Sequence, residues 1–206
     1  MRRAVLAVAA VSFTVLVGCT SVNDGTAKPV TTTNGASTST ATSESKPDKP
    51  STGEAPAVTG PELDLGKLSG PCDLLKADQL AARGITKPGA KEDDLVGPTC
   101  QWEPDDPGRG TSIGGTIMTN ADGLNSAYAR RSQFPVFQPI EVAGYPALNT
   151  DLLDGKHGEC TTSVAVAEGK AFMIQIAVND QDSAAYTAPC SVGAEVAALV
   201  VGNLKG

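Results

Sequence analysis

Alternating apolar and polar residues mark several strands in the C-terminal two thirds of the chain. Apolar runs around Trp102 and between residues 110 and 120 are separated by the turn-forming sequence Pro104 to Gly108, which is typical of a hairpin. Glu168-Gly169 marks a second tight turn. The pattern predicts strands at residues 99–103, 110–120, 138–142, 145–151, 159–167 and 170–178.

Apolar residues at helical spacing occur in three other segments. The first ends before Gly84, a residue suited to a helix C-cap, and the second begins at Asp122, which can cap a helix N-terminus. The links between successive strands are too short for parallel crossovers, so we expect an α+β fold with a single antiparallel sheet packed by helices. The expected helices cover residues 74–82, 122–133 and, with a break at Pro189, 183–204.

A long polar segment precedes these elements. Residues 20–67 are dominated by Thr, Ser, Pro, Gly, Lys and Glu and contain no aromatic residue, a composition that cannot bury enough apolar surface to fold. We therefore predict a disordered linker that ends at residue 67 and a folded domain over residues 68–206. The segment from Gly108 to Gly115 is rich in glycine, and we interpret it as turn glycines followed by a bulge in the second strand.

The N-terminus resembles a bacterial lipoprotein signal. Arg2 and Arg3 precede an apolar run that is too short to span a membrane, and the run closes on the sequence Leu16-Val17-Gly18-Cys19. The resemblance implies cleavage after residue 18 and attachment of fatty acyl chains such as palmitate to Cys19. Two or more acyl chains anchor a protein stably, which places the domain at the outer face of the bacterial cell membrane. Simple secretion, with Cys19 as an ordinary residue, is the alternative.

Four cysteines remain after Cys19, and an even number in an exported chain indicates two disulfides. Three pairings are compatible with the sequence. We favour Cys72 with Cys100 and Cys160 with Cys190, because each pair then brackets one step of helix or strand within its own half of the domain. A zinc site with four cysteine ligands is the alternative, although such sites use closely spaced pairs that this chain lacks.

The net charge argues against partners with anionic surfaces. The chain carries a formal charge of −7, and loss of Arg2 and Arg3 with the signal leaves −9. Such a charge is unsuited to binding nucleic acid or anionic lipid headgroups. The expected contact with the membrane is therefore the N-terminal lipid alone.

Several short motifs resemble an actinobacterial lipoprotein family known as domain of unknown function 3558. They are Pro71-Cys72-Asp73-Leu74-Leu75, Cys100-Gln101-Trp102, Tyr145-Pro146-Ala147 and the two later cysteines, Cys160 and Cys190. The resemblance extends over residues 68–206. It implies a lipid-anchored envelope protein with a sheet-and-helix fold, and it supplies no catalytic residues.

Candidate chemistry is sparse. His157 is the only histidine, and it lies in a glycine-flanked sequence typical of a hairpin loop rather than of a catalytic triad. The acidic pairs match no calcium-binding loop, and we expect neither a metal nor another cofactor. Phe134 and Phe137 form the densest aromatic segment of an aromatic-poor domain, which makes them either core residues or a candidate binding surface.

We therefore expect a binding or accessory module rather than an enzyme. Its partner would be an envelope protein or an apolar, lipid-like ligand held between sheet and helix. Two other functions stay open. One is an envelope hydrolase that uses scattered carboxylates, and the other is a structural or immune-facing surface antigen.

Overall fold

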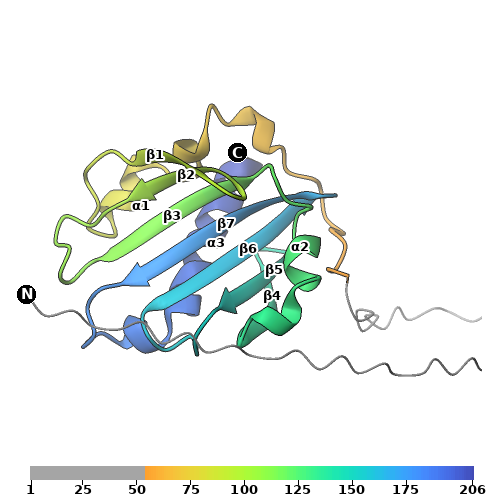
Figure 1. The fold of residues 1–206 in the computed structure, drawn as a ribbon. Coiled ribbons are helices and arrows are strands. Elements are labelled where there is room, and N and C mark those ends of the chain that lie inside the picture. Colours follow the sequence, from red (N-terminus) through yellow and green to blue (C-terminus); the bar gives the residue numbers. More distant parts are fainter. Residues whose placement is uncertain (1–53) are drawn as a thin grey trace, which may run out of the picture. The chain divides into compact units, whose positions relative to one another are not determined.

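The computed structural model describes residues 54–206, so the signal sequence and Cys19 lie outside the described residues. Seven strands form one antiparallel sheet in the order β1-β2-β3-β7-β6-β5-β4 (Figure 1). This confirms the expected α+β fold. The strands are β1 (Ala90–Asp94), β2 (Gly97–Trp102), β3 (Thr111–Met118), β4 (Val136–Val142), β5 (Tyr145–Asp151), β6 (Glu159–Ala167) and β7 (Lys170–Val178).

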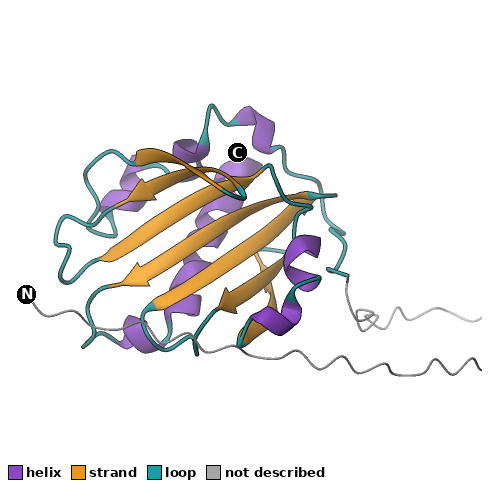
Figure 2. Cartoon of the chain, in the orientation of Figure 1, coloured by secondary structure: helices purple, strands orange, loops and turns teal. Residues whose placement is uncertain are grey.

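One long helix and several short ones accompany the sheet. The long helix, α3 (Pro189–Lys205), begins at the proline where a break was expected, because a proline in the first turn removes no intrahelical hydrogen bond. In the view of Figure 2, α3 lies behind the sheet. The short helices are η1 (Leu65–Lys67), η2 (Pro71–Leu74), α1 (Ala77–Ala81), α2 (Asn125–Tyr128), η3 (Arg131–Gln133) and η4 (Ala184–Thr187).

The main core lies between α3 and one face of the sheet. Alternate residues of β7 point toward the helix, and Phe172, Ile174 and Ile176 are buried there. Val196 and Val200 of α3 are fully buried against them. The space between α3 and the sheet is therefore filled by side chains.

Both expected disulfides are present. Cys72 of η2 is bonded to Cys100 of β2 with the Cα atoms 5.0 Å apart, and Cys160 of β6 is bonded to Cys190 of α3 with the Cα atoms 5.1 Å apart. Each bond fastens a covering segment to the sheet. Closing loops of this size contributes roughly 3 to 4 kcal/mol each in the chain-entropy model.

The folded domain begins earlier than residue 68. The backbone N–H of Leu63 donates a hydrogen bond to the carbonyl of Val166 at 2.9 Å, and the Leu63 side chain is buried. The Tyr145 hydroxyl donates to the Pro61 carbonyl at 2.7 Å. The predicted linker boundary at residue 67 is therefore wrong. Isolated apolar residues in this polar segment, such as Leu63, pack against the sheet and hydrogen bond to it.

Three further predictions of local structure were wrong. Strand β1 was missed because all its side chains are exposed and give no apolar signal. The helix expected over residues 122–133 is interrupted at Arg130, whose backbone leaves the helical region, and the chain enters β4 at Val136. No bulge occurs at Gly114 or Gly115, since β3 keeps a continuous register with both neighbours. The irregularity lies in β6 instead, between Ala165 and Ala167.

No helix within residues 54–206 combines the length and the apolar character that a membrane crossing requires.

Two glycines of α3 provide a matched test of the helix–sheet contact. A Cβ at Gly193 would lie 2.5 Å from the Oγ1 atom of Thr162, whereas a Cβ at Gly202 would meet no atom within 4 Å. We expect Gly193→Ala to lower the free energy of unfolding by about 1 to 3 kcal/mol through overpacking. Gly202→Ala should raise it by about 0.5 to 1 kcal/mol, because alanine is the better helix former.

Urea unfolding of the full-length chain, followed by circular dichroism, measures both changes. Equal effects of the two substitutions would show that α3 does not approach the sheet as closely as described.

Candidate functional site

The sheet face opposite α3 is only partly covered, and we call it the open face. Its residues on β7 are Met173, Gln175 and Ala177, which alternate with the residues of the main core. A groove of about 740 Å³ lies over this face, and its lining includes Glu92 of β1 and Ser126 of α2. Figure 1 shows β1 and α2 toward opposite edges of the sheet. This size falls in the range of ligand-binding clefts.

Strand pairing places the central residues of the open face in one row. Gln101 of β2 pairs with Gly114 of β3, Gly114 pairs with Gln175 of β7, and Gln175 pairs with Thr161 of β6. All four residues line the groove. A Cβ at Gly114 would lie 2.9 Å from Oε1 of Gln101 and 3.0 Å from Oε1 of Gln175, so the two carboxamides lie side by side over the glycine backbone.

The rows on either side differ in how their polar groups are used. Thr99 and Thr116 share a hydrogen bond of 2.7 Å and are buried. The Ser112 hydroxyl donates to a carboxylate oxygen of Glu103 at 2.6 Å. These hydroxyls are satisfied within the protein. By contrast, neither Gln101 nor Gln175 makes a side-chain hydrogen bond to any residue within the range 54–206.

Exposed leucines lie at one end of the groove. Leu152 and Leu153 follow β5 directly and line the groove, and their exposed fractions are 69% and 56%. The Asp151 carboxylate holds this loop by accepting hydrogen bonds from the backbone N–H groups of Leu152 at 2.9 Å and Gly155 at 2.7 Å. The loop therefore presents apolar surface from a fixed turn.

The α2–η3 segment forms one wall of the groove and packs on the sheet through a small second core. Leu124 and Tyr128 lie against Leu148 and Ala165, and the Phe137 ring meets the Tyr128 ring edge-on at 5.0 Å. Tyr128 is only 6% exposed, and its hydroxyl has no hydrogen-bond partner among the described residues. Burial raises the pKa of this hydroxyl.

The structure gives Phe134 and Phe137 different positions. Both rings are half-buried, and their centroids are 6.5 Å apart. Phe134 lines the groove, whereas Phe137 packs beneath the α2–η3 segment, where the Arg131 guanidinium lies 5.0 Å from its ring centroid. Phe134 therefore belongs to the wall of the groove, whereas Phe137 belongs to the small second core.

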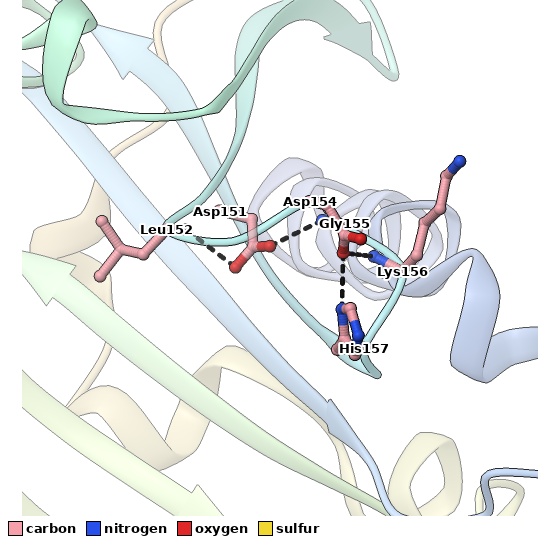
Figure 3. Close-up of polar contacts among 6 residues, drawn as sticks. All are labelled: Asp151, Leu152, Asp154, Gly155, Lys156 and His157. Atoms are coloured by element: carbon pink, nitrogen blue, oxygen red, sulfur yellow. Dashed lines mark hydrogen bonds and ion pairs between the residues drawn. The ribbon is translucent and has the colours of Figure 1, made fainter.

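His157 lies in the β5–β6 loop, as expected (Figure 3). Its Nδ1 atom is 2.7 Å from Oδ1 of Asp154, and both side chains are more than half exposed. The hydrogen bond with His157 and a second one from the backbone N–H of Lys156 lower the pKa of Asp154. The contacts drawn in Figure 3 therefore stabilise a turn at the surface.

The acidic side chains form no metal site within residues 54–206, where no three His, Cys, Asp or Glu residues come together suitably for an ion. Glu92, Glu103 and Glu159 line the groove as separate exposed groups on three different strands or strand ends.

A family model described as a protein of unknown function, DUF3558, matches residues 14–203. The chain belongs to this family. The match confirms the resemblance inferred from the cysteine and tryptophan motifs. No curated protein and no solved structure matches the chain. The open face of this DUF3558 protein is therefore the feature that bears on its function.

Sequence reasoning missed the central row of this DUF3558 protein. Gln101 was noted only as part of a cysteine motif, and Gly114 was interpreted as a bulge. One signal was present, since Gln175 is the single polar residue between Ala171 and Val178. A lone carboxamide in an apolar strand indicates a face that is not packed against a helix.

The two phenylalanines can be separated by stability. We expect Phe137→Ser to lower the free energy of unfolding by about 1 to 3 kcal/mol, because it removes the ring that packs on Tyr128. Phe134→Ser should lower it by less than half as much, since that ring lines the groove. Urea unfolding of each single variant checks this, and a larger loss for Phe134 would contradict it.

Proposed function

We propose that the protein is a lipid-anchored binding module on the outer face of the bacterial cell membrane and that the open face is its binding surface. The observation that carries the proposal is the groove over a sheet face that no long helix covers. Rigid strands position its floor, which suits recognition with little loss of conformational freedom on binding.

The side chains of the groove favour a binding surface over a face that contacts only water. Its floor includes the half-buried Met173 and two carboxamides without internal partners, and its rim includes the exposed Leu152 and Leu153. A purely solvated face has no need of exposed leucines. Apolar surface together with unpaired donors and acceptors is typical of a surface that a partner covers.

The proposed anchor lies outside the described residues, and its support is the sequence alone. Cys19 follows the apolar run at the position of a lipidated cysteine, and 34 residues separate it from Glu54. An anchored domain meets its partners within a thin layer at the membrane, which raises their effective concentration.

The anchor is tested by substituting the cysteine. Cys19→Ala is expected to move the protein from the membrane fraction to the medium or the soluble fraction, because it removes the acylation site. Fractionation of cells followed by immunoblotting measures this. If the substituted protein stayed in the membrane fraction with its signal uncleaved, a transmembrane anchor would replace the lipid.

Occupation of the open face is tested by cysteine labelling. Leu153→Cys lies at the groove, and Glu195→Cys lies on α3, and both native side chains are well exposed. With a membrane-impermeant maleimide, we expect Leu153→Cys to react readily in the purified full-length protein and to be protected on intact cells. Glu195→Cys should react equally in both. Equal labelling of Leu153→Cys in both settings would count against a binding role of the groove.

A further inference from the structure

We propose that the row Gln101, Gly114 and Gln175 binds the main chain of an extended, basic peptide segment of a partner protein. The proposal rests on the binding role argued above and names the chemistry of the occupant. The hydrogen-bonding capacity of the row, the acidic groups beside it and the blocked edges of the sheet together carry it.

The two carboxamides have the hydrogen-bonding groups that a peptide requires. A glutamine side chain offers two N–H donors and one carbonyl acceptor, which match the C=O and N–H of a peptide unit. Both carboxamides lie over Gly114 and have no partner within residues 54–206. Because Gly114 has no side chain, both carboxamides lie close over its backbone, so a main chain laid across them can reach both.

The edges of the sheet are poor sites for the same segment. Edge strand β1 carries Lys91, Glu92, Asp93 and Asp94, all exposed, and charged side chains discourage strand addition. Edge strand β4 contains Pro139, which lacks the N–H that an added strand needs. A peptide is therefore better placed on the open face than at an edge.

The charge of the groove specifies a basic partner. Glu103 is two residues beyond Gln101, and Glu159 is two residues before Thr161, so the backbones of both acidic residues are displaced from the row by about 7 Å along the strands. Glu92 flanks the row on the other side, and Arg130 is the one cation among the described lining residues. Lysine or arginine at alternate positions of an extended segment points to one side of it and matches Glu103 and Glu159, which lie on the same side of the row.

The apolar part of the groove completes the specificity. Met173, on the other side of the row from Glu103 and Glu159, offers apolar surface to the residues that alternate with the basic ones. The expected occupant is thus a segment in which basic and apolar residues alternate. A polycation without apolar residues meets the acidic groups but leaves this surface exposed.

The test uses a fluorescein-labelled decapeptide of alternating lysine and valine and the full-length protein in detergent micelles. Fluorescence anisotropy should detect saturable binding. Gln101→Ala and Gln175→Ala should each weaken it about tenfold, and Gly114→Ala should weaken it at least as much because its Cβ would displace both carboxamides. Gly202→Ala, on the helix behind the sheet, is the matched glycine control and should bind unchanged.

Two control peptides separate main-chain recognition from charge. A decapeptide of alternating glutamate and valine should not bind, and N-methylation of the lysine–valine backbone should abolish binding. Undiminished binding of the N-methylated peptide, or of lysine–valine peptide to both glutamine variants, would overturn the proposal. Urea unfolding shows whether Gly114→Ala is folded, and the two glutamine variants decide the matter if it is not.

The remaining outcomes distinguish this inference from the proposed function. If the peptide does not bind but Leu153→Cys is still protected on cells, the peptide proposal is overturned and the groove remains a binding surface. Saturable binding of chitotetraose that Gln175→Ala abolishes would replace the peptide by a glycan. Labelling of Leu153→Cys on cells at the rate of the purified protein, together with no peptide binding, would overturn both.

Discussion

The structure depends on unequal coverage of the sheet: the seven-stranded sheet has two faces, and residues 54–206 supply one long helix to cover them. Helix α3 fills one face with a continuous apolar core, and disulfides fasten its N-terminal turn and η2 to the strands beneath. On the other face the short α2–η3 segment covers only the side formed by β5 and β6. The open face is what remains, and its strands are held rigid by the core behind them.

The local pattern of the sequence predicts much of this fold. Period-two alternation located six of the seven strands, and cysteine parity with the order of elements gave both disulfides. The failures share a physical cause. Strand β1 carries no large apolar residue to mark it, and Leu63 becomes part of the core only because a distant strand, at Val166, offers its backbone a partner.

The candidate site was harder to predict because its residues are brought together by the register of strand pairing. Gln101, Gly114 and Gln175 lie far apart in the sequence and become neighbours only through two strand pairings. The hairpin of β2 and β3 follows from the local pattern, but its register and the pairing of β3 with β7 do not, and a shift by one residue in either pairing would put one of the three residues on the opposite face from its neighbour. Phe134 was identified by composition, and its partner Phe137 serves packing, so aromatic scarcity alone did not distinguish the two roles.

The two glycines of β3 connect core and site within one dipeptide. A Cβ at Gly115 would lie 2.9 Å from the Trp102 ring, so this glycine makes room for the largest core side chain. Gly114, on the opposite face, makes room for two carboxamides that contribute nothing to the core. A strand interior with two adjacent glycines is weakened in its own right. Packing in the core explains the first glycine, whereas the second is explained by the two carboxamides that lie over it on the open face.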